Sequence, residues 1–268
     1  MEERPVIFLD SGIGSIPYAH FFHLRNKNVK LILVADRANF PYGSKSKEKL
    51  TELLLSLVNE LIKKFNPMLL VIACNTATIS AIEALRTKFP NLPMVGTVPA
   101  IKPAALFSGK RTIGVLGTQR TVEDPYINEL ALQFGKDCRL IAKAAPELVE
   151  FIEHSWYKAD REERLNTARY WVDFFCKEDS DTLVLSCTHF LLLREEFKLC
   201  GKDKAVEIFD SLEGVVKRTE FLLPGNVSLP DVQEPPLMMI TGKEEPHAAW
   251  EDICSFFGFS FGENIIIP

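Results

Sequence analysis

The first candidate for chemistry is a cysteine that follows a short apolar segment. Leu69–Ala73 is typical of a buried strand, and Cys74 comes directly after it. Asn75 and Thr76 then indicate the start of a helix, whose free N–H groups and dipole favour the thiolate form of a nearby cysteine. These two side chains also offer hydrogen-bond donors to a carboxylate. The alternative is a buried cysteine beside an ordinary helix cap.

A second cysteine stands in the same kind of place. Cys187 follows the apolar segment Thr182–Leu185, after one serine, and precedes Thr188 and His189. A histidine two residues from a thiol can accept or supply a proton. On its own, this pair is compatible with a nucleophilic cysteine, as in acyl transfer, or with a purely structural histidine.

Two thiols in equivalent settings indicate a symmetric reaction. Racemisation is such a reaction, because one thiolate removes the α-proton from one face of the substrate and the other thiol delivers a proton to the opposite face. The α-proton is far less acidic than a thiol, so the carbanion needs closely placed donors. A cysteine hydrolase built on Cys187 and His189 would leave Cys74 without a role. A binding domain without activity would make both cysteines ordinary core residues.

Further polar groups follow other predicted strands. Asp10 is placed to bind an ammonium group or to assist a thiol, and its alternative role is a helix cap. Tyr42 and Gly43 belong to a Pro-Tyr-Gly turn that could bring backbone N–H groups to a ligand. Thr118 and Thr121 supply two hydroxyls at a strand-to-helix junction, which suits an anion.

The elements that would position these groups alternate between short strands and longer helices. Helical patterns such as Lys47–Phe65 and Glu162–Phe175 lie between apolar, β-branched segments, which is typical of an α/β protein with mainly parallel sheets. We predict that these strands are buried on both faces. They are Val6–Leu9, Val29–Ala35, Leu69–Ala73, Pro93–Gly96, Thr112–Leu116, Leu140–Ala142, Thr182–Leu185, Val206–Phe209 and Leu237–Ile240.

The polar groups recur at similar spacing, which indicates two related halves. The step from Ser11 to Thr118 is 118 − 11 = 107 residues, and that from Cys74 to Cys187 is 187 − 74 = 113. Ligands of open parallel sheets bind beyond the carboxyl ends of the strands, so we expect two pseudo-symmetric, doubly wound domains facing a central cleft. Residues 1–97 plus 209–268 would form the first domain, and 98–208 the second. Coincidence between unrelated strand ends is the alternative.

The chain after Val206 is expected to return to the first half and complete its sheet. Leu223–Pro236 is rich in proline and polar residues, which predicts a loop before one last strand and helix. The tail, Phe259–Pro268, is apolar enough to dock on the fold but carries no chemistry.

Composition excludes several functions. The 268 residues carry 31 Lys and Arg against 36 Asp and Glu without a basic block, so nucleic-acid binding has no electrostatic basis. No apolar run reaches the ~18–20 residues of a membrane span and no signal peptide is visible, so we expect a cytoplasmic protein.

The six cysteines lack CxxC or zinc-finger spacing and no lysine has a Schiff-base setting, so we expect reduced thiols, no metal and no cofactor. A homodimer is compatible with the sequence but not indicated by it.

These segments together resemble the glutamate racemases of the aspartate/glutamate racemase superfamily. The matches run in order along nearly the whole chain. They are Asp10-Ser-Gly-Ile-Gly14, Pro41-Tyr-Gly43, Cys74-Asn-Thr-Ala77, Gly96-Thr-Val-Pro99, Gly117-Thr-Gln-Arg-Thr121, Val149-Glu-Phe-Ile-Glu153 and Cys187-Thr-His189. The ordered set is highly specific, although each motif alone is not.

The resemblance implies racemisation of glutamate without pyridoxal phosphate or metal, supplying D-glutamate for peptidoglycan. It gives Cys74 and Cys187 the proton-transferring roles, with Asp10 assisting Cys74, and with His189 and Glu153 assisting Cys187. It assigns the binding of the substrate to Ser11, Tyr42, Gly43, Asn75, Thr76, Thr118, Thr121 and Thr188.

Three departures from the family pattern flank these residues. Gly14-Ser15 stands where a glycine pair is usual, Ser186 where a glycine precedes the second cysteine, and Phe190-Leu191 where Tyr-Pro is usual. None removes a reacting group, so they bear on loop geometry, turnover and substrate choice. An aspartate racemase is the nearest alternative, and the Thr-His after Cys187 favours glutamate.

Overall fold

The chain folds into two α/β units, described here from a computed structural model that covers residues 4–224, 234–243 and 248–266. Unit 1 comprises Met1–Thr97 and Leu212–Pro268, and unit 2 comprises Val98–Ser211. The predicted second boundary, after residue 208, falls inside strand β8 (Glu207–Phe209), which is hydrogen-bonded to the sheet of unit 2. The loop predicted over Leu223–Pro236 lies mostly outside the described residues.

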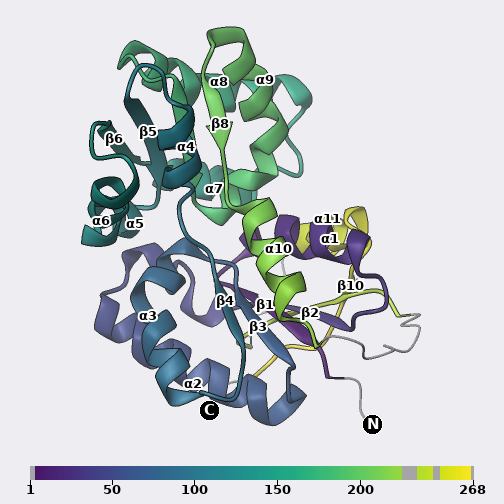
Figure 1. Cartoon of the computed structure of the whole chain (residues 1–268). Helices are drawn as coiled ribbons and strands as arrows, with labels where there is room; N and C mark the ends of the chain where they lie inside the picture. Colours follow the sequence, from purple (N-terminus) through teal and green to yellow (C-terminus); the bar gives the residue numbers. More distant parts are fainter. Residues whose placement is uncertain (1–3, 225–233, 244–247, 267–268) are drawn as a thin grey trace. The chain divides into compact units, whose positions relative to one another are not determined.

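The sheet of unit 1 has six parallel strands in the order β10-β9-β2-β1-β3-β4 (Figure 1). Its central strands β1, β2 and β3 are fully buried and, apart from Asp10 at the end of β1, apolar, as expected for a parallel sheet covered on both faces. The strands are β1 (Val6–Asp10), β2 (Leu31–Ala35), β3 (Leu69–Ile72), β4 (Met94–Gly96), β9 (Leu237–Ile240) and β10 (Ser260–Phe261).

Helices cover both faces of this sheet. Ile7 and Leu9 of β1 join the core formed by α2 (Lys47–Phe65) and α3 (Asn75–Lys88). Phe8 points the other way, and its ring lies 5.6 Å from that of Phe22 on α1 (Ile16–Arg25). Figure 1 shows α10 (Leu212–Leu222) and α11 (Ala248–Phe256) on the same side as α1. This alternation follows directly from the period of two along a strand.

Helix α2 shows why these segments are helical. Its buried residues recur at intervals of three and four, which places them on one face: they are Leu50, Leu54, Leu57, Val58 and Leu61. The Ser46 side chain caps the first turn by accepting a hydrogen bond from the Lys49 N–H, and the left-handed Asn66 ends the helix. The predicted bounds of this helix are therefore confirmed.

The sheet of unit 2 has four parallel strands in the order β6-β5-β7-β8. They are β5 (Thr112–Gly117), β6 (Arg139–Ala144), β7 (Thr182–Ser186) and β8. Ile113 and Val115 of β5 pack on α4 (Ile101–Phe107), whereas Gly114 faces α8 (Arg161–Lys177). A Cβ atom at Gly114 would lie 2.5 Å from the Phe175 ring, so only glycine allows this helix to approach.

The remaining helical segments of unit 2 follow the same alternation with strands. They are α5 (Gln119–Glu123), α6 (Pro125–Phe134), α7 (Pro146–His154), the short 3-10 segment η4 (Thr188–Leu193) and α9 (Arg194–Lys204). Strand β6 corrects one prediction. It is exposed or half-buried along its length because it lies at the edge of the sheet, and not buried on both faces. Strand β8 lies at the opposite edge and is not buried on both faces either, because Glu207 is exposed and Phe209 half-buried.

The two units repeat one strand order. Strands β2-β1-β3-β4 of unit 1 and β6-β5-β7-β8 of unit 2 correspond one to one in sequence order. The registers also agree: Leu9 pairs with Ile72, and Gly117 pairs with Ser186. Continuing each register past the strand ends sets Cys74 opposite Ser11, and Cys187 opposite Thr118. The spacing found in the sequence therefore corresponds to the same structural position in both units.

All nine predicted strands are present, with small shifts at their ends. The segment Val206–Phe209 does not return to the first half, because β8 pairs with β7 in unit 2, whereas β9 and β10 do join the sheet of unit 1. Strand β10 lies in the tail that we expected only to dock. Across the described ranges, no helix is long and apolar enough to cross a membrane.

Candidate active site

Cys74 lies at the start of α3, as predicted. It follows β3, has an extended backbone and is the N-cap residue of the helix, where its carbonyl accepts a hydrogen bond from the Thr78 N–H at 2.9 Å. The residue is buried, with 7% of its surface exposed. A thiol beside free N–H groups of a helix is favoured as thiolate.

Two threonines hold the segment that carries Cys74. The Thr78 hydroxyl donates to the Ile72 carbonyl at 3.2 Å and accepts from the Thr97 N–H at 2.9 Å. The Thr97 hydroxyl donates to the same carbonyl at 2.9 Å. Thr78 packs so close to the end of β4 that a Cβ atom at Gly96 would lie 2.5 Å from its methyl group. The Gly96-Thr97 motif therefore fixes the end of β3, two residues before the thiol.

Asp10 ends β1 and is completely buried. One of its carboxylate oxygens accepts hydrogen bonds from the Ser11 N–H at 2.6 Å and from the Ser11 hydroxyl at 3.3 Å. The predicted alternative, a helix cap, does not describe it, because the next helical turn begins at Ile13 with Gly12 as its N-cap and no side-chain cap.

The Tyr42 hydroxyl is hydrogen-bonded to a buried carboxylate, Asp36, which was not among the predicted site residues. Asp36 is fully buried at the end of β2 and accepts hydrogen bonds from the Tyr42 hydroxyl at 2.7 Å, from the Asn39 amide and from the Thr241 hydroxyl. The position of Asp36 directly after a buried strand, like that of Asp10, was the signal that could have identified it. Thr241 offered no such signal, being 205 residues away.

Burial raises the pKa of Tyr42 well above its ordinary value. The charge of Asp36, its hydrogen bond to the phenol, and the charges of Cys74 and Asp10 raise this pKa further. Tyr42 therefore stays a neutral hydrogen-bond donor close to both Cys74 and Asp10. It begins a 3-10 turn, Tyr42–Ser44, which also contains Gly43.

Asn75 and Thr76 form the first turn of α3 and are each 3% exposed. Within the part of the chain that the structure describes, the Asn75 side-chain nitrogen is buried without a hydrogen-bond partner. A buried amide donor without a partner costs about 1–3 kcal/mol, so its retention beside a thiol fits a donor kept for a ligand.

In unit 2, three side chains form a hydrogen-bonded chain that ends at Cys187. The Cys187 sulfur lies 3.8 Å from His189 Nδ1, and His189 Nε2 lies 2.6 Å from Glu153 Oε1. All three residues are buried, and Glu153 comes from α7, 36 residues before the histidine. When Glu153 is ionised its carboxylate only accepts, so that Nε2 then carries a proton, and Nδ1 faces the sulfur. This arrangement can pass a proton to or from the thiol.

The hydroxyls of unit 2 stand at the neighbouring strand end. Thr118 caps α5 by accepting from the Thr121 N–H at 3.2 Å, and its hydroxyl donates to that of Thr121 at 3.0 Å. Thr188 is buried directly after Cys187. Among the described residues, the buried Ser186 hydroxyl has no hydrogen-bond partner. Ser186 is the residue that replaces the glycine usual before the second cysteine.

Residues 4–224, 234–243 and 248–266 contain no group of three or more His, Cys, Asp or Glu side chains that could hold a metal ion. The expectation that neither metal nor cofactor takes part stays a prediction.

Comparison with known proteins gives the same family at three levels. The profile described as Asp/Glu/Hydantoin racemase matches residues 24–219. Glutamate racemase of Treponema pallidum subsp. pallidum is 40% identical over 224 residues, covering 83% of this chain and 82% of that protein. Glutamate racemase of Proteus mirabilis is 33% identical over 256 residues, covering 95% and 88%. The crystal structure of Escherichia coli glutamate racemase with L-glutamate and the activator UDP-MurNAc-ala matches with a TM-score of 0.86, 28% identity and 99% coverage of each chain.

The chain therefore belongs to the Asp/Glu/hydantoin racemase family. It is an isomerase acting on amino acids, and its activity is that of a glutamate racemase.

Proposed function

We propose that Cys74 and Cys187 interconvert L- and D-glutamate as a pair of proton-transferring thiols. The observation that carries this proposal is their equivalence: each follows the third strand of the same parallel strand order, and each caps the helical segment that follows. Each cysteine also has a carboxylate in its own unit, Asp10 in unit 1, and Glu153 through His189 in unit 2.

The reaction needs one thiolate and one thiol on opposite sides of the α-carbon. When Cys74 is the thiolate, its sulfur takes the α-proton, and the electron pair of the broken C–H bond is left on the substrate. Cys187 then gives its proton to the opposite face and becomes the thiolate, and His189, whose Nδ1 faces the sulfur, assists this transfer. The roles reverse for the other enantiomer. The cost of the carbanion is lowered by donors to the substrate carboxylate, for which Asn75, Thr76 and Thr188 are the candidates.

Glutamate is distinguished from aspartate by where its side-chain carboxylate ends. One methylene in an apolar pocket discriminates by only ~10- to 200-fold, so selection rests on donors that the shorter acid would leave unpaired. Candidate donors are Ser11, Thr188 and the N–H groups around Tyr42 and Gly43, with Thr118 and Thr121 as further anion-binding hydroxyls. A preference for aspartate, measured as kcat/KM for the two D-amino acids, would contradict this assignment.

The test replaces each thiol and follows racemisation by circular dichroism. We expect Cys74→Ala and Cys187→Ala each to lose on the order of 10² to 10⁴ in rate. Cys200→Ala is the matched control, because Cys200 is equally buried in unit 2 but its thiol faces the Leu165 carbonyl. In deuterated water, label should enter the product α-position before the recovered substrate. Near-normal activity of either active-site variant would overturn the two-thiol assignment.

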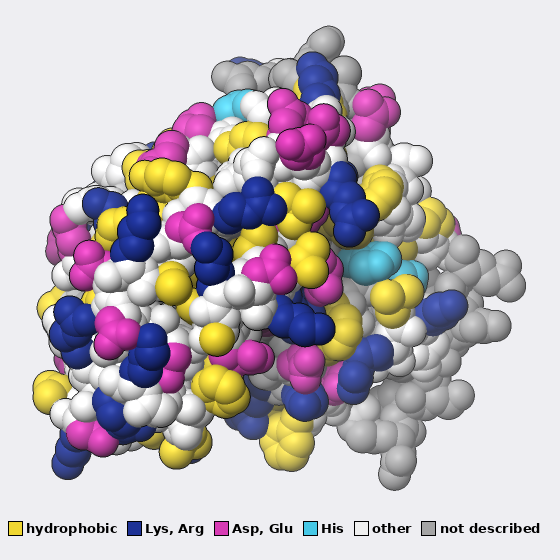
Figure 2. All heavy atoms as spheres, turned by 90° about the horizontal axis from the view of Figure 1, so that it is seen from above, with side chains coloured by type: hydrophobic (Ala, Val, Ile, Leu, Met, Phe, Trp, Pro, Cys, Tyr) yellow, Lys and Arg dark blue, Asp and Glu magenta, His cyan; other side chains and the backbone are white. Residues whose placement is uncertain are grey.

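We propose that this activity supplies D-glutamate for peptidoglycan and takes place in the cytoplasm. It needs no metal or cofactor, and the protein does not bind nucleic acid. The family resemblance supports the first point, as does the activator UDP-MurNAc-ala bound to the E. coli relative. On the face seen in Figure 2, basic and acidic side chains are interspersed, which supports the absence of a nucleic-acid surface. Cells lacking the protein should then need D-glutamate to grow, and growth without it would contradict this role. A homodimer stays compatible with these features.

A further inference from the structure

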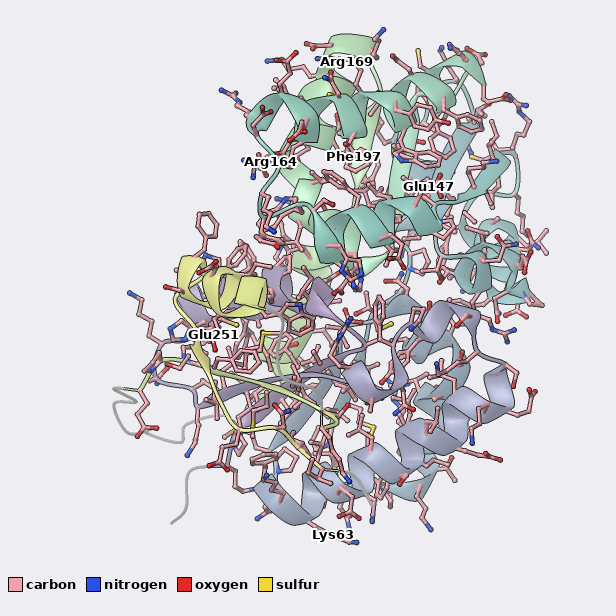
Figure 3. All side chains as sticks on the ribbon, turned by 180° about the vertical axis from the view of Figure 1, so that it is seen from behind. Lys63, Glu147, Arg164, Arg169, Phe197 and Glu251 are labelled. Atoms are coloured by element: carbon pink, nitrogen blue, oxygen red, sulfur yellow. The ribbon has the colours of Figure 1, made fainter. Side chains whose placement is uncertain are left out.

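Away from the cysteines, unit 2 has a hollow between α7 and α8. Its volume is about 250 Å³, slightly below the ~300–1,000 Å³ typical of small-molecule sites. The lining residues come from one face of each helix and are Glu147, Leu148, Phe151, Thr167, Tyr170 and Trp171. Figure 3 labels Glu147 in this part of the unit. The hollow suits a molecule of about one ring with a short side chain.

The lining combines aromatic rings with a single carboxylate. Leu148 and Trp171 are buried, whereas Tyr170 is 65% exposed, which is unusual for a large aromatic side chain. The Tyr170 and Trp171 rings stand edge to face, with centroids 5.1 Å apart. The Thr167 hydroxyl already donates to the Glu163 carbonyl, so towards a ligand it can only accept. The carboxylate and the threonine hydroxyl are therefore the polar groups of the lining that attract a hydrogen-bond donor or a positive charge. The Tyr170 hydroxyl and the Trp171 N–H are the exceptions.

The charge of Glu147 is not neutralised by the described part of the chain. No described side chain forms an ion pair or hydrogen bond with its carboxylate. Two arginines of α8, both labelled in Figure 3, are engaged elsewhere. Arg164 lies 3.8 Å from Glu196 and over the Trp156 ring, and Arg169 donates to Asn166 at 2.6 Å.

A carboxylate beside aromatic rings is the combination that recognises organic cations, because the ring faces and the carboxylate both attract positive charge. We propose that the hollow between α7 and α8 binds a small organic cation with an apolar ring, whose ammonium group lies at Glu147. This binding site lies outside the proposed reaction centre and goes beyond the racemase activity.

The site is connected to the Cys187 cluster through α7. Glu153 lies six residues after Glu147 on this helix, about 9 Å along its axis, and its carboxylate contacts His189. A ligand that wedges between α7 and α8 therefore acts on the helix that positions Glu153. This coupling rests on the proposed function, since it assumes that Glu153 assists turnover.

Glu147 also has an ordinary role that the test must separate. It lies in the first turn of α7, where a negative charge stabilises the helix dipole by about 0.3–1 kcal/mol. Glu147→Gln removes both this stabilisation and the proposed ligand contact. Glu150→Gln is the matched control, because Glu150 is an exposed carboxylate of the same helix that does not line the hollow and pairs with His154.

The binding experiment uses 2-phenylethylammonium as the probe and 2-phenylethanol as its neutral counterpart, with titration calorimetry on the full chain. We expect saturable binding of the ammonium probe and at least about fivefold weaker binding of the alcohol. The affinity for the ammonium probe should fall by a similar factor in Glu147→Gln and in Tyr170→Ala, but not in Glu150→Gln. Fivefold corresponds to about 1 kcal/mol, the scale of one cation–aromatic or exposed ion-pair contact. No saturable binding, equal binding of the alcohol, or undiminished binding to Glu147→Gln would overturn the site.

The coupling is tested by racemisation rates measured over a range of probe concentrations. We expect the probe to change kcat of the wild-type chain and of Glu150→Gln at the same half-maximal concentration, and to need an at least about fivefold higher concentration for Glu147→Gln. Binding without any change of rate would overturn the coupling while leaving the binding site standing. Failure of the two-thiol proposal would be visible separately, as activity that survives Cys187→Ala, and calorimetric binding does not depend on it.

Discussion

Replacing Thr78 by valine tests how firmly the Cys74 segment is held. Valine has nearly the shape of threonine, so it leaves no cavity and removes only the hydroxyl. The Thr97 N–H then loses its acceptor in a residue that is fully buried, which costs about 1–3 kcal/mol. The Ile72 carbonyl keeps a partner, because the Thr97 hydroxyl still donates to it at 2.9 Å.

Thr97→Val gives the matched comparison. It removes one of the two donors to the Ile72 carbonyl and orphans no group, since Thr78 still donates there. Its cost should be that of an ordinary net hydrogen bond, about 0.5–1.5 kcal/mol. The structure therefore predicts that Thr78→Val destabilises unit 1 more than Thr97→Val does.

Urea unfolding followed by tryptophan fluorescence can measure this order. The chain has three tryptophans, and with Trp156 and Trp171 replaced by phenylalanine the buried Trp250 reports on unit 1 alone. Thr78→Val should also lower kcat roughly ten- to hundredfold, because small displacements of a reacting group are costly. Thr78→Ser keeps both hydrogen bonds and should retain most activity. An equal or larger loss of stability in Thr97→Val, or unchanged kcat in Thr78→Val, would refute the reasoning.

Three other predictions concern buried titratable groups. Because burial and Asp36 raise the pKa of Tyr42, the neutral phenol stabilises the folded state fully below about pH 10, and this contribution is lost as pH rises further. Tyr42→Phe should therefore flatten the alkaline fall of the urea midpoint, and an unchanged pH profile would contradict this. Burial also raises the pKa of Cys254 to about 12, so this thiol should resist iodoacetamide in the native protein at neutral pH, as peptide mass spectrometry can check. Glu153→Gln keeps an acceptor for His189 but loses the charge-assisted bond, worth about 1.5–3 kcal/mol, so kcat should fall tenfold or more, and a wild-type value would exclude a role in turnover.

The strands were predictable because each is a short apolar run whose burial is local information. The two-residue strand Ser260–Phe261 carries no such pattern and was expected only as a docking tail. The exposure of β6 depends on strand order, which is set by packing between distant segments. The same limit applied to β8, whose partner in the sheet could not be derived from its own residues.

The candidate residues were predictable at strand ends, where parallel sheets present their ligand-binding groups. The contact between Glu153 and His189 was implied only by family resemblance, since the two are 36 residues apart. Asp36 was missed because its three donors come from a turn and from the end of β9, which the local pattern does not connect. The orphaned Asn75 amide and Ser186 hydroxyl also depend on three-dimensional surroundings.

The insertion of unit 2 into unit 1 has a consequence for biosynthesis. Strand β2 takes its outer partner, β9, from a segment that begins at Leu237, whereas the first part of unit 1 ends at Thr97. At about 5–20 residues per second, the ribosome needs about 7–28 s to make the intervening 237 − 97 = 140 residues. During that time the nascent sheet has an open edge at Leu31–Ala35, a run of five apolar residues that is buried in the finished protein. A ribosome that stalls within unit 2 would leave this edge exposed for longer. Unit 1 is therefore the domain that needs protection by chaperones, because its synthesis begins first and is completed last.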